Sequence, residues 1–105
     1  MSRSILQTER DYCLLCKMLH DVEYRGILEE HHVMYGPDRK KAEHYGLKVM
    51  LCLDHHRLGK EAVHNNKEIS DILKEYAQIV FERKYGHEKW MGVFGKNYRE
   101  VSQNE

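Results

Sequence analysis

The most informative parts of the chain are two short stretches, Cys13-Leu-Leu-Cys16 and Cys52-Leu-Asp-His55. Each stretch sets two side chains with sulfur or imidazole donors three positions apart, a spacing at which a tight turn brings both donors onto one ion. Together the two pairs supply the four donors of a tetrahedral Cys3His site. The alternative is that the three cysteines are small buried apolar residues, because free cysteine is often buried. The match between the two pairs favours a structural zinc ion.

The composition is that of a small single domain. The chain has 105 residues, of which 41% are hydrophobic, with 17 basic and 17 acidic side chains, 8 histidines and 3 cysteines. A core this small benefits from a staple, and structural zinc can contribute ~10 kcal/mol or more of apparent folding free energy. The odd cysteine count disfavours a disulfide framework and fits a reducing compartment such as the cytoplasm.

The sequence predicts no membrane partner. No apolar stretch approaches the ~20 residues of a transmembrane helix, and residues 1–20 lack a signal-peptide pattern. We therefore expect a soluble cytoplasmic protein. Its organisation is predicted as an N-terminal arm at 1–11, one domain at 12–98 and a tail at 99–105.

The order of elements predicts an α+β fold, with a zinc-stapled core, a short two-stranded sheet and C-terminal helices. We expect strands at 27–33 and 47–52, a helix at 39–45 that ends at Gly46, and a short helix beginning at residue 54. Asn65 and Glu68 have capping-box spacing for a helix of about 18–20 residues that Gly86 ends, and another helix follows at 87–94. The residues predicted to pack in the core from these two helices are Ile69, Ile72, Leu73, Tyr76, Ile79, Val80, Trp90, Met91 and Phe94.

Two histidine pairs remain to be explained. His31 and His32 lie near the end of the first predicted strand, and neighbouring side chains on a strand face opposite sides. With His55 on zinc, His31 and His56 could hold one divalent cation (Mg2+, Mn2+ or Zn2+) with positions left open for water and phosphate. His32 would then act as a general base near neutral pH. The alternative is that the pairs are ordinary polar residues or additional zinc ligands.

Basic side chains flank the histidine-rich segments. The candidates for contact with a nucleic-acid phosphate are Arg39, Lys40, Lys41 and Arg57. The alternative for residues 39–41 is a solvated helix face. Glu29 and Glu30 could orient a histidine, or simply lie on the surface at the strand end. A net charge of zero disfavours binding by bulk electrostatics, so any contact with nucleic acid would be local.

The combined pattern resembles the HNH endonucleases, also called ββα-metal or His-Me finger nucleases. It is most similar to small phage HNH-like proteins, including the recombination-enhancement nucleases. The resemblance covers roughly residues 12–98, including a similar tail from His87 to Tyr98. The motifs that carry it are Cys13-x2-Cys16, Glu30-His31-His32-Val33, Leu51-Cys52-x2-His55-His56 and Val63-His64-Asn65.

The resemblance implies a metal-dependent endonuclease that hydrolyses DNA in phage recombination or DNA processing, with RNA as a further possible substrate. It implies phage or host recombination proteins as partners and the host cytoplasm as the location. His31 and His56 match the ligands of the catalytic metal, and His32 matches the general base. His64 is a further candidate ligand, with a capping or DNA-contact role as the alternative. The positions that match the structural zinc set are Cys13, Cys16, Cys52 and His55.

The chain departs from the family pattern at one position. The middle Asn of the family, expected near Leu47, is absent. That Asn braces the loop that carries the base, and Tyr45, His44 or Asn65 are candidates to replace it. The departure favours an alternative function, a noncatalytic zinc-stabilised module that binds DNA or protein with a decayed nuclease site.

Overall fold

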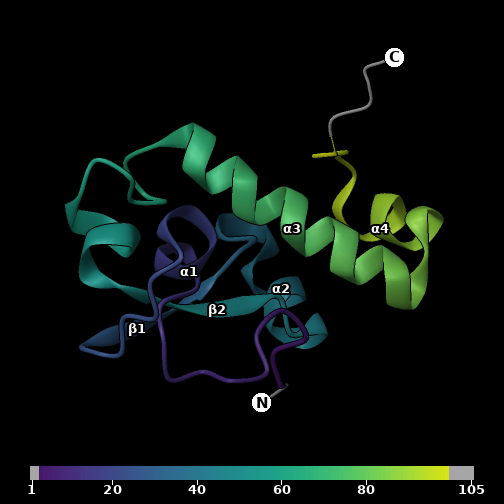
Figure 1. Cartoon of the computed structure of the whole chain (residues 1–105). Coiled ribbons are helices and arrows are strands. Elements are labelled where there is room, and N and C mark those ends of the chain that lie inside the picture. Colours follow the sequence, from purple (N-terminus) through teal and green to yellow (C-terminus); the bar gives the residue numbers. More distant parts are fainter. Residues whose placement is uncertain (1–2, 100–105) are drawn as a thin grey trace.

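Two antiparallel strands lie at the centre of the chain, with helices around them (Figure 1). The computed structural model describes residues 3–99. The predicted α+β class is confirmed. The elements are α1 (Leu14–His20), β1 (Leu28–His32), η1 (Gly36–Asp38), α2 (Arg39–Tyr45), β2 (Lys48–Cys52), η2 (Asp54–Leu58), α3 (Lys67–Tyr85) and α4 (His87–Phe94). Among these helices none combines the length and the apolar character needed to cross a bilayer.

The strand register places the two ends of the sheet at different candidate sites. Leu28 pairs with Cys52 at one end, and His32 pairs with Lys48 at the other. Both strands are slightly shorter than predicted. The connection through α2 ends at Gly46, as predicted, in the left-handed conformation with φ 74°. A Cβ there would lie 2.1 Å from the carbonyl oxygen of Arg3, so glycine is required by both φ and space.

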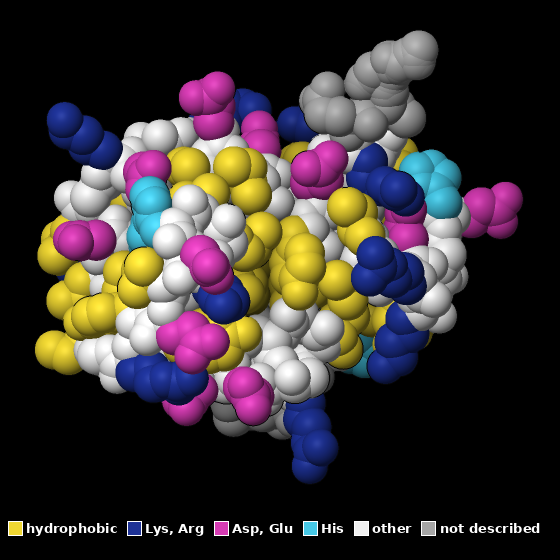
Figure 2. All heavy atoms as spheres, viewed as in Figure 1, with side chains coloured by type: hydrophobic (Ala, Val, Ile, Leu, Met, Phe, Trp, Pro, Cys, Tyr) yellow, Lys and Arg dark blue, Asp and Glu magenta, His cyan; other side chains and the backbone are white. Residues whose placement is uncertain are grey.

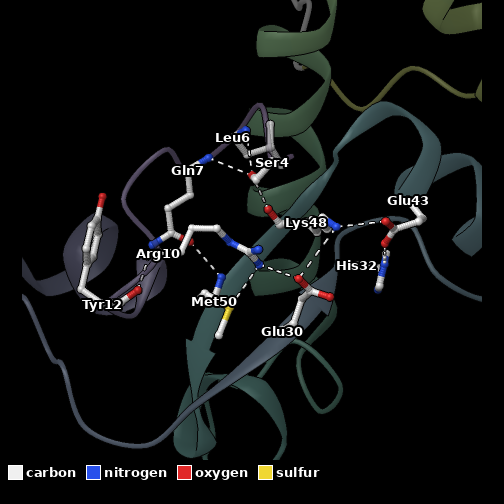
Figure 3. Close-up of polar contacts among 10 residues, drawn as sticks. All are labelled: Ser4, Leu6, Gln7, Arg10, Tyr12, Glu30, His32, Glu43, Lys48 and Met50. Carbon is white, nitrogen blue, oxygen red and sulfur yellow. Dashed lines mark hydrogen bonds and ion pairs between the residues drawn. The ribbon is translucent and has the colours of Figure 1, made fainter. Parts of the chain in front are cut away.

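The N-terminal segment packs along the edge of β2 that does not face β1. The hydroxyl of Ser4 donates to the carbonyl of Lys48 (2.6 Å), and the amide N–H of Met50 donates to Oε1 of Gln7 (2.8 Å). Leu6 lies in the core with 4% exposure. Figure 3 shows these contacts. The polar, aperiodic sequence of this segment gave no sign that it would complete the sheet edge.

Helices α3 and α4 supply much of the core. Ile69 and Leu73 are buried as predicted, and Ile72, Tyr76 and Val80 are half-buried against the core. Ile79 is half-buried outside the core cluster. Trp90 is fully buried, and Phe94 packs on it with ring centroids 4.3 Å apart. The predicted stripe omitted two fully buried apolar residues of α3, Ala77 and Phe81.

The predicted cap of α3 was one residue too early. Asn66 is the N-cap, and its side-chain oxygen accepts from the N–H of Ile69 (3.2 Å). The amide of Asn65 instead donates to the carbonyls of Arg57 (2.8 Å) and Gly59 (3.3 Å). Two adjacent asparagines both suit a helix start, and Asn65 is drawn away because the backbone in and after η2 offers carbonyl acceptors.

Candidate metal centres

The four predicted zinc ligands form one cluster. Nδ1 of His55 lies 3.7 Å from Sγ of Cys13, and 3.4 Å from Sγ of both Cys16 and Cys52. The sulfurs of Cys16 and Cys52 are 3.8 Å apart. Around a tetrahedral zinc with bonds of ~2.0–2.3 Å, sulfur and nitrogen donors lie about 3.6 Å apart and two sulfurs about 3.8 Å. The cluster could therefore hold a metal ion such as zinc.

Three elements bring these donors together. Cys13 is the N-cap of α1, and its sulfur accepts from the N–H of Cys16 (3.4 Å), an arrangement that places both sulfurs at the start of one helix. Cys52 ends β2, and His55 lies in η2 directly after it. The sequence predicted a tight turn at Cys13 but not α1 itself. Cysteine is an uncommon cap, so the start of this helix carried no usual signal.

Electrostatics in this cluster favour a bound cation. Burial, together with hydrogen bonds and charge from the neighbouring Cys13 and Cys52, raises the pKa of the Cys16 thiol to about 12. Burial also raises the pKa of Cys52. Three thiolates this close repel one another, and a dication would remove that repulsion as it displaces the thiol protons.

Glu61 orients His55 from the side opposite the sulfurs. Its Oε1 lies 3.4 Å from Nε2 of His55 and 2.8 Å from Nε2 of His20, whose ring stacks on His55. With Nδ1 of His55 facing the cysteines, Nε2 carries the proton and points to this carboxylate. Carboxylates that hold metal-binding histidines in this way fix the ring and its tautomer. The sequence did not point to Glu61, because no local pattern joins it to His55.

A second cluster contains three histidines from three segments. His31 is the next-to-last residue of β1, His56 lies in η2, and His64 follows in the loop before α3. One ring nitrogen from each residue lies within 4.8 Å of the others, and the Nε2 atoms of His56 and His64 are 3.2 Å apart. Tetrahedral nitrogen donors with bonds of ~2.0–2.1 Å would be about 3.3 Å apart. The predicted ligands His31 and His56, with the further candidate His64, thus form a group that could hold a metal ion.

The π-helical turn η2 sends two adjacent histidines to two different clusters. His55 faces the cysteines while His56 faces His31 and His64. The N–H of Val63 donates to the carbonyl of His55 (2.8 Å), and the N–H of His64 to that of His56 (3.4 Å). These bonds fix the loop that carries His64. The wide turn gives the His55 and His56 side chains their separate directions, and such turns are frequent at functional sites.

The histidine cluster presents neutral rings and unprotonated nitrogens that could bind a metal ion. Burial, together with the nearby His56 and His64, lowers the pKa of His31 to about 3, so His31 is neutral at pH 7. Nδ1 of His56 lies 2.7 Å from Oε1 of Glu29, which leaves Nε2 toward the cluster. Hydrogen bonds from Arg57 and then His56 lower the pKa of Glu29 to about 2. Glu29 is therefore ionised and orients a histidine, one of the two roles considered for it.

His32 belongs to a separate polar network, shown in Figure 3. Its Nε2 lies 2.7 Å from Oε1 of Glu43, and Nζ of Lys48 donates to the other oxygen of that carboxylate (3.0 Å). Lys48 is 1% exposed and lies 4.0 Å from Glu30, which also pairs with Arg10 (2.7 Å). Glu30, His32 and Glu43 could themselves group around an ion. The ammonium of Lys48 already supplies positive charge there.

The three candidates to replace the missing Asn are engaged with other groups. Tyr45 packs on Phe81 (ring centroids 5.1 Å), His44 packs on Tyr45 (4.7 Å), and Asn65 holds loop carbonyls. The side chain that holds His32 is Glu43. Sequence alone did not single out Glu43, although it lies on the predicted helix at 39–45.

The two histidine groups open on one pocket of about 160 Å3. Its lining residues are Glu30, His31, His32, Tyr35, Arg39, His56 and His64. Of the predicted phosphate contacts, only Arg39 lines it. Lys40 is exposed elsewhere, Lys41 donates to the carbonyl of Val93 (2.8 Å), and Arg57 is bound to Glu29 through Nε and Nη2 (both 3.0 Å).

The described chain is thus a small α+β domain with two neighbouring groups of cysteine and histidine side chains that could hold metal ions. One group is rich in sulfur and mostly buried, and the other is made of imidazoles at a pocket. Comparisons with protein-family models, with curated proteins and with solved structures find no match. An assignment of function therefore depends on the chemistry of these two groups.

Proposed function

We propose that the protein is a metal-dependent endonuclease that hydrolyses DNA phosphodiester bonds. The observation that carries this proposal is that His31, His56 and His64 share a pocket with His32. Three imidazoles that could hold an ion, beside a fourth that could accept a proton, are the components of metal-assisted hydrolysis.

In this proposal the cysteine cluster has a structural role and the histidine cluster a catalytic one. The four donors of Cys13, Cys16, Cys52 and His55 would close the coordination of a zinc ion, so that ion would stabilise the fold without touching substrate. Three donors at the histidine cluster leave positions for substrate. A divalent ion bound there, Mg2+, Mn2+ or Zn2+, would stabilise the negative charge that develops on the scissile phosphate and on the leaving oxygen.

His32 is the proposed general base. The carboxylate of Glu43 accepts a hydrogen bond from Nε2–H of His32, and this leaves Nδ1 with the lone pair that takes a proton from water. Lys48 holds the second oxygen of Glu43 and so fixes its orientation. Arg39, at the rim of the same pocket, is placed to contact the phosphate.

The proposed substrate is DNA held through local contacts. Figure 2 shows basic and acidic side chains interspersed over the visible face, in keeping with the net charge of zero. Affinity for DNA would then come from contacts near the cut, or from phage or host recombination proteins that present the DNA. We place this activity in phage DNA recombination or processing in the host cytoplasm, and RNA is a second substrate to be tested.

A second candidate function is a noncatalytic zinc-stabilised module that binds DNA or protein. The observation that favours it is the absence of an Asn near Leu47, where the nuclease family has one. The two candidates differ in what His32 does. A nuclease needs the His32 imidazole to accept a proton, whereas a binding module needs His32 only to fill its place in the packing.

The test is cleavage of supercoiled plasmid in Mg2+ or Mn2+ by the parent, by His32→Ala and by His87→Ala. His87 is an exposed histidine on α4 and serves as the matched control. We expect nicking by the parent and the control, and loss of at least about 10²-fold in His32→Ala, because a general base contributes about 10²–10⁴-fold. Zinc content and circular dichroism should be equal in all three. No cleavage with any divalent ion would favour the binding module, and equal cleavage by His32→Ala would remove His32 from the mechanism.

A further inference from the structure

A second, larger pocket adjoins the histidine pocket. Its volume is about 430 Å3, and Tyr35 and His64 line both pockets. The other side chains that matter in it are Lys67 and Lys74 of α3, with Lys96 and Tyr98 of the segment after α4. A volume of this size is in the range of small-molecule sites, which begin at about 300 Å3. Whatever binds at the histidine cluster therefore has a neighbouring pocket into which it can extend.

This pocket is lined by three lysines and one carboxylate, that of Asp71, so its positive charge is only partly compensated. Nζ of Lys74 lies 4.7 Å from the ring centre of Tyr35 and 5.4 Å from that of Tyr98. Nζ of Lys96 lies 5.1 Å from the Tyr98 ring. Neither Lys74 nor Lys96 forms an ion pair with another residue of the described range 3–99, whereas Lys67 is neutralised by Asp71 (2.6 Å). Two ammonium groups thus remain available to an anion.

The backbone that carries Lys96 and Tyr98 is fixed by other contacts. Gln78, fully buried on α3, donates to the side chain of Asn97 (2.7 Å) and accepts from the N–H of Tyr98 (2.7 Å). The indole N–H of Trp90 donates to the carbonyl of Lys96 (2.7 Å). The lysine head groups are therefore not needed to fasten this segment to α3, and the pocket is formed before anything binds.

We propose that this pocket binds a nucleotide of the cleaved strand, next to the phosphate that lies at the histidine cluster. Lys74 and Lys96 would contact its phosphate, and the Tyr98 ring would stack on its base. Cationic grooves with aromatic side chains are the usual way to hold a single strand without sequence preference. The inference rests on the proposed nuclease function, and it explains how a neutral protein could hold nucleic acid through a few local contacts.

The structural alternative is that the lysines and tyrosines form only a cation–π clamp. Lys84 provides a matched control for it, because it lies on the same helix with Nζ 5.4 Å from the ring of Tyr85, away from the pocket. A pure clamp predicts that Lys74→Ala and Lys84→Ala alter thermal stability alike and leave nucleic-acid binding unchanged. A nucleotide site predicts a difference in binding between them.

The test measures binding of a short fluorescein-labelled single-stranded oligodeoxynucleotide by anisotropy, in a His32→Ala background with Mg2+, where cleavage should be at least about 10²-fold slower. We expect Lys74→Ala/Lys96→Ala to bind more weakly and to lower the salt dependence (log K against log salt) by about 1.4, since each phosphate contact on a single strand contributes about 0.7. Tyr98→Ala should lose about five- to hundredfold in affinity, and Tyr98→Phe should stay within about twofold of the parent. Lys84→Ala should match the parent. A matching oligoribonucleotide tests whether the pocket distinguishes the two sugars.

Cleavage kinetics separate this inference from the proposed function. With His32 intact, Lys74→Ala/Lys96→Ala should raise KM with kcat unchanged, because the pocket lies beside the reacting groups. If the parent cleaves and this double variant matches Lys84→Ala in binding, salt dependence and KM, the nucleotide site is overturned and the nuclease stands. If the parent binds DNA but never cleaves, and the double variant binds more weakly, the pocket stands and the nuclease falls.

Discussion

Glu43→Gln isolates the role of the carboxylate that contacts His32. In the parent, one oxygen of Glu43 lies 2.7 Å from Nε2 of His32 and the other accepts from Lys48 (3.0 Å). Glutamine has the same shape but only one acceptor oxygen. If that oxygen stays with the buried ammonium of Lys48, the NH2 group faces His32 and forces the proton from Nε2 to Nδ1. The nitrogen that should accept the proton of water is then blocked.

The expected magnitude follows from this change of tautomer. Cleavage by Glu43→Gln should fall by about 10²-fold or more, and no further than in His32→Ala, because a general base contributes about 10²–10⁴-fold. The variant exchanges the hydrogen bond between the Glu43 carboxylate and His32 for a neutral one, which should cost about 1 kcal/mol of the free energy of unfolding, because bonds to charged groups contribute about 1.5–3 kcal/mol and neutral ones about 0.5–1.5 kcal/mol. Plasmid nicking gives the rate, chemical denaturation gives the stability, and the 15N shifts of the His32 ring give the tautomer.

Glu68→Gln, an exposed change at the start of α3, is the control and should alter none of the three readouts. Cleavage by Glu43→Gln at the parental rate, with the His32 proton still on Nε2, would disprove the orienting role. Glu43 would then be an ionic partner of Lys48 and nothing more. The NMR measurement keeps the prediction testable on protein that does not cleave.

Three further predictions concern the metal centres. Cys16→Ser should unfold the domain, because a structural zinc contributes ~10 kcal/mol or more against a typical stability of about 5–15 kcal/mol. The unfolding would be seen as loss of both bound zinc and helical circular dichroism. A folded, zinc-free variant would contradict the structural role of the ion. Zinc binding at pH 7 should release at least two protons, because the raised thiol pKa values keep Cys16 and Cys52 protonated before the ion binds. Calorimetry in buffers of different ionisation enthalpy measures this release. Zinc affinity should therefore fall as the pH is lowered. Glu29→Gln should weaken the catalytic ion about 10–100-fold while the cysteine cluster keeps its zinc; equal loss at both centres would argue against separate sites.

Features fixed by local spacing could be predicted from the sequence. The two members of each donor pair lie three residues apart, so Cys13, Cys16, Cys52 and His55 were recognisable from their spacing alone. The alternation of side chains along a strand and the second histidine pair predicted His31 and His56 as metal ligands, and the structure groups them with His64. The end of α2 at Gly46 and the helix at 87–94 could be predicted for the same reason, because a glycine directly follows the last residue of each helix.

Features that depend on distant segments could not be predicted. Glu43 and Glu61 reach their histidines only after α2 and the loop after η2 fold back, and nothing in the neighbouring sequence joins them. Lys48 would be expected in water, yet it is buried between two carboxylates. The error at the cap of α3 has a different cause. Asn65 and Asn66 are equally suitable caps in the sequence, and only the hydrogen bonds from the Asn65 side chain to carbonyls in and after η2 leave Asn66 as the cap.

Whether the chain holds two separate ions can be measured by a cobalt titration of the metal-free protein under reducing conditions, followed by absorption spectroscopy. Two equivalents should bind. The first should give a sulfur-to-cobalt charge-transfer band together with folding, and the second should give none and should disappear in His56→Ala. A single equivalent in both proteins, or loss of the charge-transfer band in His56→Ala, would contradict a closed structural ion beside a separate open one.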